Sequence, residues 1–297
     1  MAASMPCKDC ASGVLHEGTP LGREETVHGL KTYVTGPPPG VDAKGMVVII
    51  PDIFGWSLNN SRVLADRYAE RGGYLVYLPD FMNGENPKVL VYPGSLLSTV
   101  HTVTDPKTPI LHKIFPGLRA MTHMPFALYY CRASICKPRI FSFFSSLRSS
   151  TSLPIGAAGF CWGGKYVTLL CQDTERSSSG KTLLDCGFTA HPSQLVLPMD
   201  IEAVKMPLCI SSGSMDFLLQ PEGYEMIKEV FARKEGELNA EGKRGAMFEM
   251  NVVDGAKHGF AIRGNPGDED EKRRGQMAED QAVDFFGRWL VPNQGWA

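Results

Sequence analysis

Short apolar runs rich in β-branched residues constrain the fold of this chain more than any other feature. The run MVVIIP at 46–51 is continuous, as expected for a strand buried on both faces of a parallel sheet. The segment 58–71 after it has Leu58, Val63 and Leu64 on one side and predicts a helix. Further apolar runs predict strands over 74–80, 155–160, 206–213 and 247–253. Segments between and after them predict helices over 165–171 and 268–290, so that strands alternate with helices along the chain. Together they predict the α/β class, with one doubly wound, mostly parallel sheet flanked by helices.

The length of the chain favours a single large domain. Its 297 residues, 43% of them hydrophobic, suffice for a substantial core, and they contain no internal repeat. We assign 1–27 to an N-terminal extension and 28–297 to the α/β domain. Residues 83–150 fit the alternation poorly. At least one helix is expected within 107–148, around 126–136.

The balance of charges argues against partners that are recognised by bulk charge. The chain has 30 basic and 32 acidic residues and a formal charge of −2, so we expect neither a nucleic acid nor a membrane as partner. No run approaches 18 uninterrupted apolar residues, and the first 30 residues lack a basic-then-apolar signal pattern. A cytoplasmic protein is therefore expected. The sequence leaves open whether it is a monomer or a homodimer.

The eight cysteines are interpreted as reduced thiols. Several lie in apolar runs, where a reduced cysteine behaves as a small hydrophobic residue, and no export signal favours disulfides. Cys7 and Cys10 form a lone C-x-x-C, without a second pair at zinc-site spacing. This pattern favours an N-terminal extension over metal or redox use, and we expect neither a metal nor a cofactor.

The segment GFCWGG at 159–164 places Cys161 where a buried strand meets a helix. G-x-C-x-G is the sulfur version of the G-x-S-x-G nucleophile elbow, and Cβ atoms at Gly159 or Gly163 are expected to crowd its strained turn. The positive end of the helix dipole favours a thiolate at this position. The amide of Trp162 is then available to a developing oxyanion. A small buried thiol is the alternative, but the context favours a nucleophile.

A thiol nucleophile needs a base, and the base needs an acid that orients it. In this fold class the chain order is nucleophile, acid, histidine, and only His191 and His258 follow Cys161. His258, in a Gly-flanked loop after the last predicted strand, is the expected base. His191, in TAHPS, is interpreted as a pocket-wall or structural histidine, with a direct role left open. Asp216, in SSGSMDF, follows the strand at 206–213 and is the expected acid.

Five motifs resemble those of the dienelactone hydrolase (carboxymethylenebutenolidase) family of α/β-hydrolases. They are PDIFGW at 51–56, YLVYLPDF at 74–81, GFCWGG at 159–164, GSMDFLLQPE at 213–222 and HGFAIRG at 258–264. The resemblance covers about residues 28–291 and suggests a fungal-type member. It implies that Cys161 is the nucleophile, His258 the base and Asp216 its partner. It also implies an oxyanion hole built from the amides of Trp162 and Ile53.

The resemblance implies further residues around the substrate. An acid before the I-F-G segment contacts the resting thiol in this family, and an arginine after the histidine pairs with that acid or with a substrate carboxylate. Asp52 holds the acid position, where bacterial members carry Glu, and Arg263 lies one residue further along than in the bacterial pattern. Arg119 is a candidate for a second substrate-binding arginine. Trp56 and Phe160 are candidates for substrate contact, with a core position as the alternative.

These residues predict a hydrolase that cleaves a small-molecule ester or enol-lactone through a thioester acyl-enzyme. One rival places a thioesterase or a secondary-metabolite tailoring hydrolase at the same site. The other is a non-catalytic thiol-based sensor or binding protein. The intact order of Cys161, Asp216 and His258 argues against this second rival, because a binding protein does not need all three.

Overall fold

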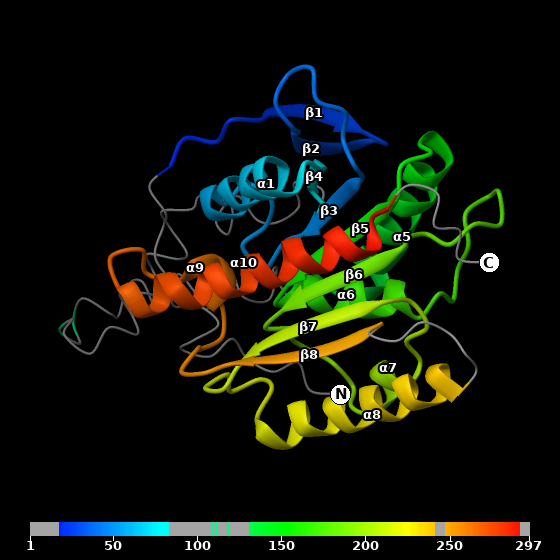
Figure 1. The fold of residues 1–297 in the computed structure, drawn as a ribbon. Coiled ribbons are helices and arrows are strands. Elements are labelled where there is room, and N and C mark those ends of the chain that lie inside the picture. The colour runs from blue at the N-terminus through cyan, green and yellow to red at the C-terminus, as the bar shows by residue number, and fades with distance from the viewer. Residues whose placement is uncertain are drawn as a thin grey trace.

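A computed structural model describes residues 18–82, 131–240 and 247–291, together with 109, 111 and 118. In this part of the chain eight strands form one sheet in the order β1-β2-β4-β3-β5-β6-β7-β8 (Figure 1). The strands from β4 to β8 in this order are parallel, whereas β2 is antiparallel to both of its neighbours. The bounds are β1 (Arg23–Val27), β2 (Leu30–Thr35), β3 (Met46–Ile50), β4 (Leu75–Pro79), β5 (Ile155–Phe160), β6 (Cys186–Ala190), β7 (Leu208–Gly213) and β8 (Phe248–Val253).

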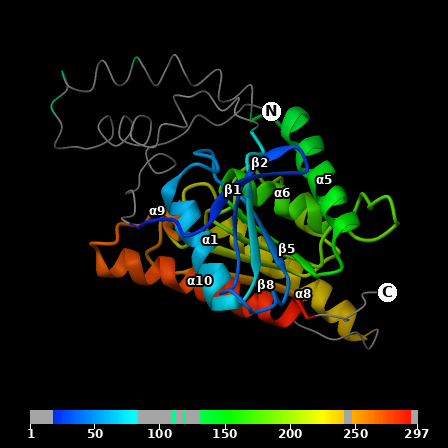
Figure 2. The same ribbon diagram turned by 90° about the horizontal axis from the view of Figure 1, so that it is seen from above.

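Helices cover both faces of this sheet, so the doubly wound α/β prediction is confirmed. One face packs against α1 (Asn59–Gly72), α9 (Phe260–Arg263) and α10 (Glu269–Trp289). The other face packs against α5 (Ala133–Ser150), α6 (Trp162–Cys171), α7 (Met199–Glu202) and α8 (Pro221–Ala240). In Figure 2, α1 and α10 lie on one side of the strands, and α5 and α6 lie on the other.

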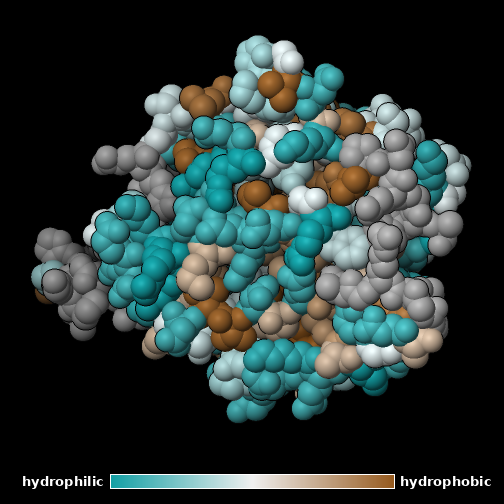
Figure 3. All heavy atoms as spheres, viewed as in Figure 1, coloured by the Kyte–Doolittle hydropathy of each residue, from teal (hydrophilic) through white to brown (hydrophobic). Residues whose placement is uncertain are grey.

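The alternation of side chains along β3 produces two cores. Val47 and Ile49 belong to the cluster under α1 and α10, whereas Val48 and Ile50 belong to the cluster under α6. All four side chains are fully buried, which explains why the strand reads as an uninterrupted apolar run. The outer surface of α10 is largely hydrophilic in Figure 3, as expected for a helix with one buried stripe. No helix in the described ranges is long and apolar enough to cross a bilayer.

The five predicted strands and three predicted helices are all present, but three strands were not predicted. The strand β1 is exposed along most of its length and has no apolar run, and it lies inside the segment 1–27 assigned to an extension, so the sheet begins before residue 28. The strand β2 pairs antiparallel at the same edge, and β6 is a short CGFTA segment with little β-branching. The helix expected within 107–148 is present, because α5 begins at Ala133 and continues to Ser150. Residues 126–130 of the stretch around which it was expected lie outside the described residues.

Candidate active site

The three predicted catalytic residues follow three different strands of the sheet. Cys161 comes after β5, Asp216 after β7 and His258 after β8. Because these strands are parallel, their carboxyl ends lie at one edge of the sheet, where ligands bind in folds of this kind. All three residues are buried. The structure therefore brings the predicted set together at the edge where the sequence places it.

Cys161 adopts a backbone conformation that few non-glycine residues adopt. Its φ is 50° and its ψ is −113°, directly before the first residue of α6. A Cβ on Gly159 would lie 2.6 Å from the carbonyl oxygen of Gly163, and a Cβ on Gly163 would lie 2.0 Å from the carbonyl oxygen of Ile50. The expectation that side chains at these two glycines would crowd the turn is confirmed.

His258 and Asp216 form a direct pair. Nδ1 of His258 lies 2.9 Å from Oδ2 and 3.1 Å from Oδ1 of Asp216. The Leu218 N–H donates to Oδ1 at 2.9 Å, which fixes the carboxylate. An Nδ1–H bonded in this way leaves Nε2 as the ring atom that exchanges a proton.

The charge state of His258 depends on the thiol. Burial alone would lower the pKa of His258, but the charge of a Cys161 thiolate and hydrogen bonds to Asp216 and Cys161 outweigh it. Together they raise the pKa of His258 to about 10. The charge of His258 is therefore coupled to that of Cys161.

Asp52 and Arg263 form a second buried pair. Nε of Arg263 lies 3.1 Å from Oδ2 of Asp52, and both side chains are almost completely shielded from solvent. The Phe54 N–H donates to Oδ1 of Asp52 at 3.0 Å, and the Arg263 guanidinium lies 4.9 Å from the centre of the Phe54 ring. Burial, opposed by Arg263 and reinforced by a thiolate at Cys161, raises the pKa of Asp52 to about 6. The charge of Asp52 is thus coupled to that of Cys161.

The two predicted oxyanion donors lie in the loop after β3 and in the first turn of α6. Ile53 is half-buried and directly follows Asp52. The Trp162 indole packs 4.6 Å from the Tyr166 ring, and its Nε1–H donates to the Cys131 carbonyl oxygen at 3.0 Å. The side chain of Trp162 is therefore fixed below the helix, which leaves its amide, not its ring, as the group at the elbow.

Trp56 and Phe160 both pack into the core. The Trp56 ring is buried under the Arg62 guanidinium, 4.8 Å from the ring centre. Phe160 is buried between Phe188 and His191. The core position that the sequence left as an alternative describes both residues in this structure, and substrate contact by either stays a prediction.

The segment after β6 contributes two residues beside Cys161 and His258. The His191 ring is fully buried with its centre 4.9 Å from that of His258, and burial together with the charges on His258 and Arg263 holds its pKa well below the usual range. His191 is therefore uncharged and packs against His258 at one side of the site. Oγ of Ser193 lies 3.8 Å from Sγ of Cys161. Sequence reasoning missed Ser193, and only the polar end of TAHPS next to an apolar segment pointed to it.

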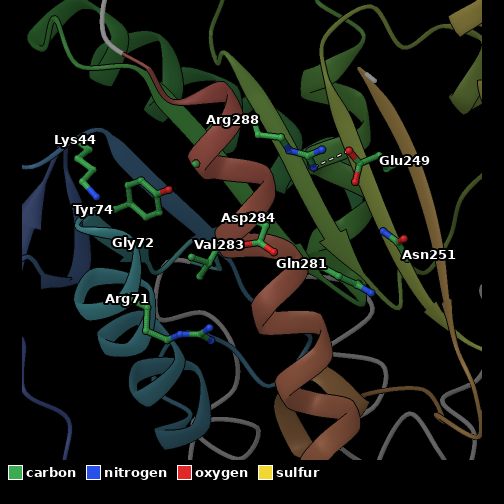
Figure 4. A pocket seen from close by; sticks show the side chains of 11 residues that line it. Lys44, Arg71, Gly72, Tyr74, Glu249, Asn251, Gln281, Val283, Asp284 and Arg288 are labelled. Carbon is green, nitrogen blue, oxygen red and sulfur yellow. Dashed lines mark ion pairs between the residues drawn. The ribbon is translucent and has the colours of Figure 1, made fainter. Parts of the chain in front are cut away.

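A cavity of about 620 Å³ lies away from these residues (Figure 4). Lys44 lies two residues before β3 and Tyr74 lies directly before β4, so the cavity that both line is toward the amino ends of those strands. Arg288 and Glu249 form an ion pair in its wall. This cavity is distinct from the catalytic edge.

Several sequence predictions concern residues outside the described ranges. Arg119, Cys7 and Cys10 all lie there. The six cysteines within the described residues are free and buried. No cluster of three or more potential metal ligands was found among the described residues.

Comparison with known sequences identifies the family. The profile of the dienelactone hydrolase family matches residues 30–290. The chain belongs to this family. It is 27% identical to "Hydrolase tropI" of Talaromyces stipitatus, over 97% of this chain and 98% of that protein. It is 33% identical to the human "Carboxymethylenebutenolidase homolog" over 54% of each chain. Membership makes the protein a hydrolase, as the resemblance of its motifs implied.

Solved structures share the fold. Esterase 2 of Thermogutta terrifontis superposes with a TM-score of 0.55 at 15% identity, over 93% of this chain and 98% of that one. A dienelactone hydrolase of Anabaena variabilis superposes with a TM-score of 0.50 at 15% identity, over 93% and 100%. At this identity the comparison establishes the α/β-hydrolase fold and leaves the chemistry to the residues of the site.

Proposed function

We propose that this chain is a cysteine hydrolase that cleaves small-molecule esters or enol-lactones through a thioester acyl-enzyme. The observation that carries the proposal is the His258–Asp216 pair at 2.9 Å, next to a thiol held at the start of α6 in a strained backbone conformation. A nucleophile, a base and an orienting acid within one buried site are the minimum set for acyl transfer.

The acylation step follows from these positions. The Cys161 thiol gives its proton to Nε2 of His258, and the thiolate attacks the carbonyl carbon of the substrate. The carbonyl electron pair moves to oxygen, where the amides of Trp162 and Ile53 donate hydrogen bonds to it. When the carbonyl re-forms, the bond to the leaving oxygen breaks and His258 protonates that oxygen.

Deacylation uses the same groups in reverse. Water gives a proton to His258 as it attacks the thioester, and the thiolate leaves when the carbonyl re-forms. Asp216 holds Nδ1–H through both steps and stabilises the imidazolium. Because a thiolate leaves readily, attack is productive mainly when the substrate's own oxygen leaves as readily. This condition favours enol-lactones and activated esters.

Asp52 and Arg263 set the charge around the nucleophile. A carboxylate near Cys161 opposes a thiolate, and the Arg263 charge at 3.1 Å offsets that carboxylate. We propose that the pair shapes the field at the thiol while His258 takes its proton.

The test is steady-state hydrolysis of an enol-lactone, an aryl ester and an acyl thioester by wild type and Cys161→Ala. The variant should lose at least about 10³-fold in kcat, because loss of one oxyanion donor alone costs 10²–10³ in other enzymes. Cys171→Ala, which removes a buried thiol at the far end of the same helix, is the matched control and should keep full activity. Unchanged turnover in Cys161→Ala would refute the proposal.

The acyl-enzyme gives an independent readout. Trypsin cleavage after Arg148 and Lys165 releases peptide 149–165, whose single cysteine is Cys161. Rapid acid quench during turnover should add the acyl mass to this peptide. If thioesters are the best substrates of the panel, the thioesterase alternative replaces the lactonase assignment on the same site. If no acyl adduct forms and no substrate turns over, the non-catalytic thiol protein is the better description.

A further inference from the structure

The segment 191–193 after β6 passes directly beside the nucleophile. Ala190 at the end of β6 is the register partner of Phe160 at the end of β5. The Cys161 N–H donates to the Ala190 carbonyl oxygen at 3.3 Å, and the Ser193 N–H donates to the Cys161 carbonyl oxygen at 3.0 Å. Backbone hydrogen bonds therefore tie Cys161 both to the last residue of β6 and to Ser193 at the end of the segment.

Close packing against α6 holds the segment in place. A Cβ on Gly164, in the first turn of α6, would lie 2.3 Å from Oγ1 of Thr189 and 2.8 Å from Cβ of Pro192. Only glycine lets the helix approach the segment this closely. The position of Ser193 relative to Cys161 is thus set by the fold and not by its own side chain.

The Ser193 hydroxyl is buried against the thiol. Ser193 is 7% exposed, and its Oγ lies 3.8 Å from Sγ of Cys161, within hydrogen-bonding distance for sulfur. Within the described ranges this is the one hydrogen bond that the structure gives the hydroxyl. A serine hydroxyl carries one donor and two acceptor positions. It can accept the S–H of the resting thiol and, after rotation, donate to the thiolate.

Other groups near Cys161 act through charge. His258 faces it from the loop after β8 and Asp52 from the loop after β3, with Arg263 paired to Asp52. His191, beside His258, is neutral. Asp52 opposes the thiolate, and His258 gives up its positive charge whenever it delivers a proton. Ser193 differs from all of them, because its hydrogen bond stays available in every step.

We propose that Ser193 is a further catalytic residue, whose Oγ–H donates a hydrogen bond to Sγ of Cys161 whenever the thiolate is present. The S–H proton passes to Nε2 of His258, while the hydroxyl keeps its own proton and only rotates. The same hydrogen bond forms again when the thiolate leaves in deacylation. This inference rests on the proposed role of Cys161 as nucleophile.

The experiment measures the reactivity of Cys161 without substrate. Iodoacetamide labels the intact protein across a pH series, and the rate at Cys161 is read from tryptic peptide 149–165. Peptide 166–176, which contains only the buried Cys171, is the internal reference. The proteins are wild type, Ser193→Ala, Ser193→Thr and Ser177→Ala, which removes another buried serine hydroxyl. A thermal melt of each confirms that it is folded.

We expect Ser193→Ala to move the midpoint of the alkylation curve upward by about one pH unit, since a hydrogen bond to a charged group is lost. Its kcat should fall by about tenfold with little change in KM, and Ser193→Thr, which keeps the hydroxyl, should restore both. An unchanged midpoint with Cys161 still reactive would overturn the role of Ser193 and leave the proposed function intact. An equal shift of the midpoint in Ser193→Thr would also overturn the role of Ser193, because a variant that keeps the hydroxyl would then shift through altered packing alone. A wild-type Cys161 no more reactive than Cys171 would instead refute the nucleophile itself.

Discussion

Replacing Gly163 with alanine tests how the elbow is built. The new Cβ would lie 2.0 Å from the carbonyl oxygen of Ile50 and 2.7 Å from that of Pro51. Both obstacles are backbone atoms at the end of β3, so neither can rotate away. A normal contact of about 3.5 Å would require α6 and β3 to separate by about 1.5 Å. Overpacking of a core costs about 1–3 kcal/mol, and a backbone obstacle places Gly163→Ala at the upper end, about 3 kcal/mol.

Urea unfolding of Gly163→Ala measures this loss in the free energy of unfolding. Gly236→Ala in α8 is the matched control, because no atom lies within 4 Å of its added Cβ and Gly236 is exposed. Alanine should stabilise the helix there by about 0.5–1 kcal/mol. The two substitutions therefore have opposite predicted signs. A loss below about 1 kcal/mol at Gly163 would show that the elbow tolerates a side chain and would refute the steric explanation of the motif.

Three further substitutions test the charges of the site. In Cys161→Ala the pKa of His258 should fall clearly below about 10, because the thiolate that contributes most to raising it is gone; NMR titration of the ring measures this, and a value that stays near 10 would contradict the coupling. Stability that the raised pKa of His258 provides in wild type is present below pH 6.5 and is lost as pH rises through about 10, so the variant should lose less stability in that range. Arg263→Gln should lower the free energy of unfolding by about 3 kcal/mol at pH 8, because it leaves the charged Asp52 buried without its partner. The loss should be clearly smaller at pH 5, because the pKa of Asp52 is raised from 3.8 to about 6 and the carboxyl is then largely protonated. Equal losses at both pH values would show that the unpaired charge of Asp52 is not the cause of the lost stability. Asp216→Asn should lower kcat by about 10⁴-fold with a melting temperature close to wild type, and a loss below tenfold would show that the acid has no orienting role.

The central strands of the fold can be predicted from the sequence because they are buried on both faces. Each of β3 and β5 is an uninterrupted run of buried residues, and such runs need no knowledge of their neighbours. The strand β6 is equally buried but carries Gly187, where a Cβ would lie 2.5 Å from Sγ of Cys171. The strand β5 has glycines packed as tightly, at Gly156 and Gly159, but it leads into the GFCWGG motif, and β6 has no such motif after it.

Some residues of the candidate site could also be predicted from local sequence, and others could not. Cys161, Asp216 and His258 follow strands that can be predicted from local pattern, and their order along the chain then assigns their roles. Ser193 depends on the register between β5 and β6, which brings residues 32 positions apart into contact. Asp52 and Arg263 required a family resemblance, since no local pattern states that they pair. Long-range register is the information that a single sequence did not supply.

If Ser193 donates a hydrogen bond to the Cys161 thiolate as proposed, the charges of the site explain why an uncharged donor is useful there. With the thiolate formed, Cys161, Asp52 and Asp216 carry negative charge, against the positive charges of His258 and Arg263. This buried group has one negative charge in excess. Burial raises the pKa of Asp52, and the Arg263 charge opposes that rise more than a Cys161 thiolate adds to it. A further cation would remove the excess but would also stabilise the resting thiolate so strongly that its attack on a carbonyl would slow. A hydroxyl stabilises the thiolate without changing the total charge, and it leaves His258 free to alternate between its two protonation states during each turnover.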